Sequence, residues 1–236
     1  MYILAFDSTA KVASAAILSD DRAIASYQIN AGRTQSELLL PMAEHMLASL
    51  SVGFSDIGLF AVSAGPGSFT GVRIGAALVK GLAFGHGVPC VGVSTLEALA
   101  ENLAGLPGLL LPVMDARRAQ VYTATFRSQD GIPVRLSPDR AVAIDALVEE
   151  LRGTTEAVYP VGDGAAAVLS ALRAANLPAI PPPPILAEEN AVSVGRVAYR
   201  SYLAGHYDGD LALRPVYLRL PQAERERLEK EKSALS

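Results

Sequence analysis

Residues 1–29 read MYILAFDSTAKVASAAILSDDRAIASYQI, and this stretch decides the fold class. A continuous apolar run ends at Asp7, and residues 12–18 and 22–29 carry small, β-branched and alternating residues. Short runs of this kind, separated by polar turns, are typical of β-strands. We therefore predict three consecutive strands that form a meander, with Asp7 at the end of the first.

The same pattern returns near residue 109. Residues 109–114 form a second apolar run that ends at Asp115, residues 121–126 have the composition of a strand, and a further segment runs from 131 to 136. Because a unit of strand, aspartate, tight loop and strand occurs twice, the sequence predicts a duplicated domain.

Each copy continues with helical patterns around one more strand. Helices are predicted at 34–50, 72–84 and 94–103 around a strand at 57–63, and at 144–151, 163–175 and 190–203 around a strand at 157–161. Thr34 and Ser94 each precede a glutamate by three residues, as in a capping box. This order predicts an α/β protein whose mixed sheets are flanked by helices. We divide it into an N-terminal lobe (1–105), a C-terminal lobe (106–221) and a charged tail (222–236).

The composition limits the class of protein. The 236 residues are 50% hydrophobic and 19% charged, with a net charge of −4. These values exclude a disordered chain and do not suggest the strongly basic face of a nucleic-acid-binding protein. The single cysteine, Cys90, cannot form an internal disulfide, so we expect a cytoplasmic setting. The N-terminus lacks the features of a signal peptide, and the apolar stretch 103–114 is too short to span a bilayer, so we expect no membrane association.

A glycine-rich loop joins the predicted strand at 57–63 to the next helix. The loop consists of Gly65, Pro66, Gly67, Ser68, Phe69, Thr70 and Gly71, with Arg73 close behind. A loop at a helix N-terminus suits an anion, but this glycine spacing matches neither a Walker loop nor a dinucleotide fingerprint. Two interpretations stay open, an anion-binding loop and a tight structural turn.

Two aspartates end equivalent strands in the two copies. Asp7 and Asp115 lie where open sheets often carry a metal or nucleotide site, or each caps the loop that follows it. Asp163 either approaches a nucleotide or caps the helix that starts beside it. The three histidines lack the spacing of a helical metal site, so we expect no metal centre in this chain.

The turn Asp7-Ser8-Thr9 resembles the first phosphate motif of the actin-like ATPase fold, which actin, sugar kinases and heat-shock-protein ATPases share. That fold has two tandem ribonuclease-H-like lobes, which matches the repeat. The resemblance implies a candidate nucleotide site at Asp7, Ser8, Thr9, Asp115, Arg117 and Arg118. However, Ala10 follows where active members commonly have glycine, and close approach of a phosphate to the backbone usually requires glycine.

The chain is more closely similar to the bacterial TsaB (YeaZ) family, whose members help to form threonylcarbamoyladenosine in tRNA. The matching segments are 3–9, 36–39 with Pro41, 65–75 (GPGSFTGVRIG), 87–89, 94–99, 115–118, 121–122 and 215–219. They arrive in the family's order, and the glycine loop is the most specific. The family often has a histidine where this chain has Gln35.

The resemblance implies a subunit without catalytic activity. The related catalytic subunit, TsaD, binds a metal through a His-x-x-x-His pair, and the corresponding residues here, Thr95 and Leu99, do not suit such a site. The chain is then expected to have no cofactor of its own and to pair with TsaD, which would carry out the transfer. It would help to recruit the ATPase TsaE and contact tRNA only indirectly, with ATP and a divalent metal on the partner subunits. A homodimer is expected where TsaD is absent.

The family's pairing surface lies on two helices of the N-terminal lobe, here 34–50 and 72–84. These helices carry more apolar residues than one core-facing stripe needs, so the pattern and the resemblance agree on the surface. The expected interface residues are Leu38, Leu39, Met42, Met46, Val72, Ile74, Leu78 and Leu82.

Two other classes of function stay open. The family has been grouped with glycoprotease-like peptidases, so one alternative is a peptidase that cleaves TsaD. Such an enzyme needs a nucleophile, for example Ser68 or Cys90, or a metal centre. The other is a small-molecule kinase of the same fold, which needs a tight nucleotide site.

Overall fold

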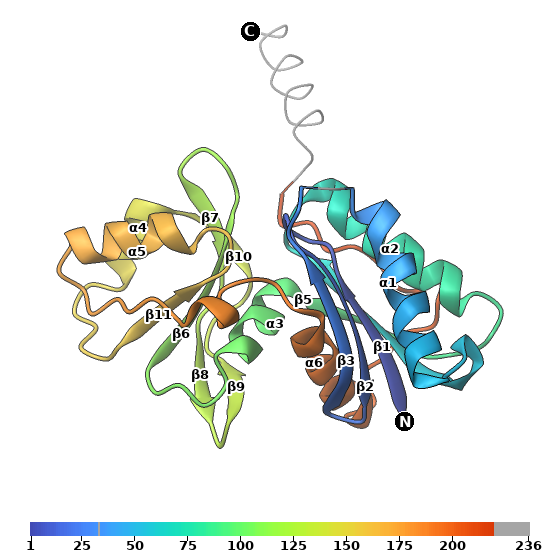
Figure 1. Ribbon diagram of the computed structural model, residues 1–236. Coiled ribbons are helices and arrows are strands. Elements are labelled where there is room, and N and C mark those ends of the chain that lie inside the picture. Colours follow the sequence, from blue (N-terminus) through green and yellow to red (C-terminus); the bar gives the residue numbers. More distant parts are fainter. Residues whose placement is uncertain (33, 220–236) are drawn as a thin grey trace, which may run out of the picture.

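The computed structural model describes residues 1–32 and 34–219, which form two lobes that are each built on a β-sheet (Figure 1). The architecture is α/β with mixed sheets flanked by helices, as predicted. The charged tail predicted at 222–236 lies outside the described residues. Within them, no helix combines the length and the apolar character that crossing a membrane requires.

The N-terminal lobe contains a five-stranded sheet in the order β3-β2-β1-β4-β5. Its strands are β1 (Tyr2–Asp7), β2 (Ala13–Ser19), β3 (Arg22–Ile29), β4 (Ile57–Gly65) and β5 (Cys90–Ser94). β1 pairs antiparallel with β2 and parallel with β4, and β2 pairs antiparallel with β3. The meander predicted for residues 1–29 is therefore confirmed.

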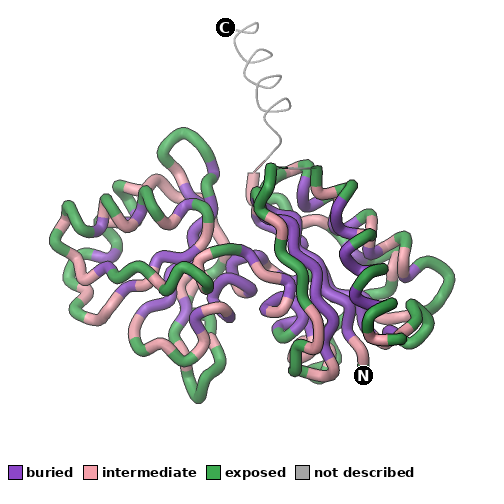
Figure 2. Tube along the Cα trace, viewed as in Figure 1, coloured by how far each residue is buried: buried purple, intermediate pink, exposed green. Residues whose placement is uncertain are grey.

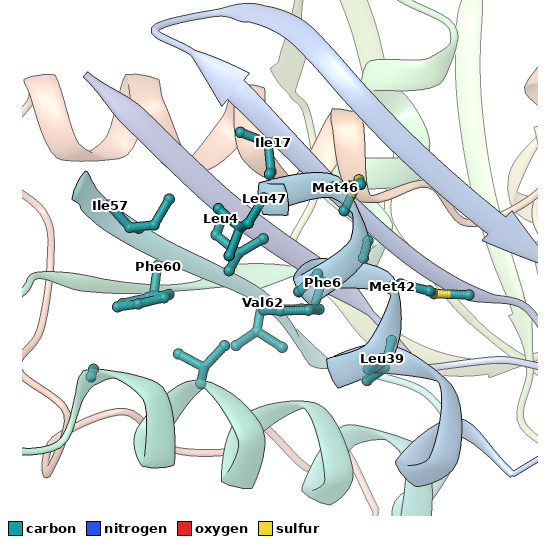
Figure 3. Packing of buried hydrophobic residues seen from close by; sticks show 14 of the residues in the cluster. Leu4, Phe6, Ile17, Leu39, Met42, Met46, Leu47, Ile57, Phe60 and Val62 are labelled. Carbon is teal, nitrogen blue, oxygen red and sulfur yellow. The ribbon is translucent and has the colours of Figure 1, made fainter. Parts of the chain in front are cut away.

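Helices cover both faces of this sheet. They are α1 (Gln35–Leu50), α2 (Phe69–Ala83) and α6 (Ala191–Leu203). Alternate residues of a strand point to opposite faces, so Leu4 and Phe6 pack on the side of α1 and α2, whereas Ile3 and Ala5 pack against α6. Figure 3 shows the first of these clusters. Buried residues accordingly concentrate in the central strands, and exposed ones lie on the loops, on edge strands such as β3 and on the outer sides of the helices (Figure 2).

The C-terminal lobe repeats the arrangement. Its elements are β6 (Leu109–Asp115), β7 (Gln120–Thr123), β8 (Phe126–Gln129), β9 (Ile132–Arg135), β10 (Arg140–Ala143), α4 (Ile144–Glu150), β11 (Val158–Val161) and α5 (Ala165–Ala174). β7 and β8 pair antiparallel with β6 in one continuous register, so the strand predicted at 121–126 exists with a break. β11 runs parallel to β6, as β4 does to β1. The predicted duplication is confirmed.

The end of the chain returns to the first lobe. α3 (Thr95–Asn102) and a short 3₁₀ turn (Pro184–Leu186) lie between the lobes, whereas α6 packs on the N-terminal sheet and Leu213 lies in the cluster with α1 and α2. The predicted C-terminal lobe, 106–221, is therefore wrong at its far end. The sequence pattern predicts the helix α6 but does not show which of the two sheets it packs against.

Two helix starts differ from the prediction. α1 begins after Thr34, whose side chain makes no capping hydrogen bond, so the capping box predicted there does not form. α2 begins at Phe69 rather than at residue 72, because Ser68 Oγ caps the helix by accepting a hydrogen bond from Gly71 N at 3.3 Å. Ser94 caps α3 as predicted and accepts from Glu97 N.

Candidate functional site: the cleft between the lobes

A cleft with a volume of about 730 Å³ lies between the two lobes. It is lined by the β1–β2 turn, the glycine loop with the start of α2, the β6–β7 turn and the segment 216–219. The polar residues in its lining include Thr9, Lys11, Ser68, Thr70, Asp115, Arg117, Asp163 and Arg219. The fold therefore brings three of the predicted site segments together, although they are far apart in sequence.

Asp7 does not face this cleft. The side chain is fully buried, and Asp7 Oδ1 accepts hydrogen bonds from Thr9 N at 2.9 Å and Thr9 Oγ1 at 2.7 Å, while Oδ2 accepts one from Ser63 Oγ. Burial raises the pKa of the Asp7 carboxyl above its ordinary value, against the opposing effect of these hydrogen bonds. Ser8 is also buried. The structure thus corrects the candidate nucleotide site at these two residues, because Asp7 caps its own loop and both side chains are enclosed.

The glycine loop covers Asp7 and Ser8. Ser68 N donates to the Thr9 carbonyl at 2.7 Å, and Ser8 Oγ donates to the Gly71 carbonyl at 2.9 Å. A Cβ atom at Gly71 would lie 1.8 Å from the Ser8 oxygen, and one at Gly67 would lie 2.6 Å from the Thr9 oxygen. The glycines therefore allow two backbone segments to touch. Of the two interpretations that the sequence left open, this contact favours the structural turn.

The segment 213–219 bridges the lobes beside this loop. Val216 N donates to the Ala64 carbonyl at 2.7 Å, and Arg73 Nε donates to Tyr217 Oη at 2.9 Å, with the guanidinium 3.7 Å above the centre of the Phe69 ring. On the other side, Arg219 Nη1 donates to the Ala116 carbonyl at 3.0 Å. This bridge was matched only as a family motif, because local pattern gives no sign of the partner of an extended segment.

The β6–β7 turn carries the second predicted aspartate. Asp115 Oδ1 accepts from Arg117 N at 2.8 Å, and its Oδ2 lies 3.1 Å from Arg117 Nη1. Asp163 Oδ1 accepts from Asp115 N at 2.8 Å instead of capping α5, so the predicted N-cap does not form. Burial raises the pKa of Asp163. Arg118 is exposed at the same turn. These residues stay open to a ligand, unlike Asp7.

Glu189 was missed by the sequence analysis. It lies in the segment that leads from the C-terminal lobe into α6, and its side chain is 2% exposed. Its Oε1 has no hydrogen-bond partner among the described residues. Burial, with the nearby charges of Asp7, Asp163 and Glu188, raises its pKa to about 8. A glutamate one residue before a helix-capping asparagine is common on surfaces, so no sequence signal marked it as buried.

Thr95 and Leu99, which the resemblance matches to the TsaD metal ligands, are both buried. Leu99 lies in an apolar cluster, and Thr95 Oγ1 has no hydrogen-bond partner within the described part of the chain. Across residues 1–32 and 34–219, no three histidine, cysteine, aspartate or glutamate side chains are grouped so that they could hold a metal ion.

The predicted partner residues divide into two groups. Five of them are buried in the chain's own core, namely Leu38, Leu39, Met42, Met46 and Val72. The prediction that they form an exposed interface is wrong, because α1 and α2 share one face of the sheet and both contribute side chains to the same cluster. Ile74, Leu78 and Leu82 are half-buried, beside the exposed Ala77 and Gly81.

The two lobes and their interlobe cleft define the class as the actin-like ATPase fold. A ROK hexokinase from Thermus thermophilus superposes with a TM-score of 0.50 at 11% identity, over 87% of this chain and 100% of that chain. At that identity the likeness shows the fold alone.

Closer similarity defines the family. A family model described as TsaD, tRNA N6-adenosine threonylcarbamoyltransferase, matches residues 24–181. YeaZ from Pseudomonas aeruginosa superposes with a TM-score of 0.76 at 25% identity, over 92% of this chain and 99% of that chain. The tRNA threonylcarbamoyladenosine biosynthesis protein TsaB of Bacillus subtilis is 35% identical over 162 residues, which cover 69% of this chain and 71% of that protein. The chain belongs to the TsaB (YeaZ) family.

Proposed function

We propose that this chain is a non-catalytic, cytoplasmic subunit required to form threonylcarbamoyladenosine at the tRNA adenosine beside the anticodon. Membership of a family whose Bacillus subtilis member is named for this process supports the role. In the proposed complex, TsaD transfers the threonylcarbamoyl group from its adenylate to adenosine. This chain pairs with TsaD and helps to recruit TsaE, while ATP and the divalent metal bind to those partners.

The floor of the cleft, formed by the enclosed residues Asp7 and Ser8, is closed to a ligand, and this observation most supports a non-catalytic role. The turn that resembles a phosphate motif is covered by the glycine loop, and the Asp7 carboxylate is fully occupied by Thr9 and Ser63. A phosphate that approached Asp7 would have to displace the Ser68–Thr9 backbone hydrogen bond. This arrangement argues against a nucleotide-dependent kinase, which needs those backbone groups for its substrate.

The outer face of α1 and α2 is the proposed pairing surface. Ile74, Leu78 and Leu82 are half-buried, and a Cβ placed on Gly81 would meet no atom within 4 Å among the described residues, apart from its chain neighbours and the backbone of its own helix. Small residues beside part-exposed apolar side chains allow a second helix to approach closely and bury apolar area. The same face would pair two copies of this chain when TsaD is absent.

The peptidase alternative lacks a suitable nucleophile. Cys90 is fully buried, and burial raises the pKa of its thiol to about 11. Ser68 Oγ accepts a hydrogen bond from Gly71 N to cap α2, and within residues 1–32 and 34–219 it makes no hydrogen bond to a histidine. A serine or cysteine nucleophile needs an adjacent base or a lowered pKa.

A transfer assay tests the proposal. The isolated chain, given tRNA and the threonylcarbamoyl adenylate, should form no threonylcarbamoyladenosine, and the addition of TsaD, TsaE and ATP should start its formation. Transfer by the isolated chain would refute the non-catalytic role. Ala77→Glu combined with Gly81→Glu should abolish co-purification with TsaD, whereas Ala167→Glu, on the exposed side of α5, should not.

A further inference from the structure

We propose that the mouth of the cleft binds the phosphate backbone of an RNA strand through Lys11, Arg118 and Arg219, with Arg117 beside them. This inference rests on the proposed function, since it assigns to this chain a direct contact with the tRNA substrate. It differs from what the overall composition suggests, because the whole chain has a net charge of −4.

Positive side chains converge on the mouth from three separate parts of the chain. Lys11 from the β1–β2 turn, Arg117 from the β6–β7 turn and Arg219 from the bridge that follows residue 215 line the cleft. Arg118 follows Arg117 at the exposed tip of the same turn, just outside the lining. Two lobes and the bridge therefore supply cations to one opening, an arrangement that sequence order does not reveal.

These cations outnumber the carboxylates around them. Asp115 is paired with Arg117, and Asp163 accepts the Asp115 N–H, while the charge of Lys11 acts to lower the pKa of Asp163. Arg118 makes no hydrogen bond or ion pair with any residue that the structure describes, and Arg219 is held by the Ala116 carbonyl rather than by a carboxylate. The mouth therefore keeps an excess of positive charge.

The β6–β7 turn keeps its arginines in place at a conformational cost. Arg117, Arg118 and Ala119 have φ values of 65°, 55° and 55°, so three consecutive residues other than glycine adopt the left-handed region. That region is unfavourable for residues other than glycine. Strained backbone of this kind is concentrated at binding sites, which supports a role for the two arginines at the tip.

The position of the charges favours an RNA strand over a free nucleotide. The cations lie at the rim, where the Arg117 side chain is 84% exposed, while the floor at Asp7 and Ser8 is enclosed. A free nucleotide needs a floor that holds its phosphates, whereas a strand can lie across the rim. Tyr122 lines the same cleft, with Arg219 5.9 Å from its ring centre, and offers an aromatic face to a base.

Fluorescence anisotropy with a labelled tRNA anticodon stem-loop tests this assignment, on the chain alone and on its complex with TsaD. Lys11→Gln combined with Arg118→Gln should weaken binding about tenfold at low salt and lower the slope of log affinity against log salt by about 1.4, or 0.7 for each lost phosphate contact. The control, Arg22→Gln combined with Arg152→Gln, removes two exposed arginines that belong neither to the cleft lining nor to the β6–β7 turn, and it should bind as the wild type does.

Three outcomes would overturn the proposal: equal affinity of the double variant and the wild type, an unchanged salt slope, or displacement of the RNA by ATP at an equal phosphate concentration. The transfer assay separates this inference from the proposed function. If the wild-type complex transfers normally while the double variant binds RNA normally, the RNA contact alone is refuted. If the wild-type complex fails to transfer, the proposed function is refuted, whatever the anisotropy shows.

Discussion

Replacement of Gly71 by alanine tests the contact between the glycine loop and the β1–β2 turn. The added Cβ would lie 1.8 Å from the Ser8 oxygen, whereas ordinary contact begins near 3.4 Å, so the two backbone segments must separate by about 1.6 Å. That movement threatens the hydrogen bonds from Ser68 N to the Thr9 carbonyl and from Ser8 Oγ to the Gly71 carbonyl. Because Asp7 and Ser8 are covered by this contact, the substitution also opens the floor of the cleft.

The expected loss of stability follows from three contributions. Overpacking of a close contact costs about 1–3 kcal/mol, and the two hydrogen bonds contribute about 1 kcal/mol each. Alanine in a helix recovers up to about 1 kcal/mol relative to glycine. Gly71→Ala should therefore lower the free energy of unfolding by about 2–4 kcal/mol, a large part of the roughly 5–15 kcal/mol of a typical domain.

Gly81→Ala on the same helix is the matched control. Gly81 is exposed, and a Cβ added there would meet no described atom within 4 Å beyond its chain neighbours and its own helix backbone. This substitution should therefore leave the stability unchanged or raise it by up to about 1 kcal/mol. Urea unfolding followed by circular dichroism measures both variants. If Gly71→Ala is as stable as Gly81→Ala, the two segments do not touch as described, and the argument for an enclosed phosphate turn fails.

Three further predictions follow from buried groups. Glu189→Gln removes a carboxyl whose pKa is raised from 4.5 to about 8. The free energy of unfolding of the wild type should therefore fall as pH rises through this window, by up to about 5 kcal/mol at about 1.4 kcal/mol per pH unit, and that of the variant should fall less. If urea unfolding shows the same pH dependence for both proteins from pH 5 to 8, this reasoning is contradicted. Leu39→Asp places an unpaired charge in the core, where Leu39 is 1% exposed, and should lower the free energy of unfolding of the lobe by about 3–5 kcal/mol, enough to unfold it. A variant that stays folded and loses only its binding to a partner would show that Leu39 is an interface residue. Cys90 should react slowly with a maleimide in the native chain near pH 8 and readily in urea, because burial raises the pKa of its thiol to about 11. Rapid labelling of the native chain would show that Cys90 lies at an open surface.

The central strand of the first lobe could be predicted because a strand that is buried on both faces needs an apolar residue at every position. The run from Ile3 to Phe6 is apolar at every position, and the structure buries it between helices on both faces. The repeat at Leu109–Asp115 was recognised for the same reason, and its partner strands pair with it as those of β1 do.

The surplus of apolar residues in α1 and α2 misled the prediction of the partner surface. The pattern indicates how many apolar side chains a helix carries, but not how many of them the sheet and the neighbouring helix bury. Here two helices lie side by side on one sheet, so Leu39 and Met46 are needed for the core. The pairing surface that we propose instead includes the exposed Ala77 and Gly81, which no hydrophobic pattern marks.

The site was only partly predictable from the sequence. Part of the glycine loop, Asp115 and Arg117, which the sequence patterns indicate as candidate site residues, line the cleft because each follows a central strand of its own lobe. Asp7 looked equivalent to Asp115, yet the loop folds over only the first of them. Glu189 and the bridge around Tyr217 are placed by contacts between distant segments, which no local pattern encodes.

A titration of the chain into the transfer reaction tests the central claim most directly. The initial rate of threonylcarbamoyladenosine formation is measured at a fixed concentration of TsaD, with TsaE, ATP, the adenylate donor and tRNA in excess. A non-catalytic subunit that pairs with TsaD predicts a rate that rises with added chain and reaches a plateau once TsaD is saturated, at a height proportional to the TsaD concentration. A rate that continues to rise in proportion to the chain, or that persists without TsaD, would contradict the account.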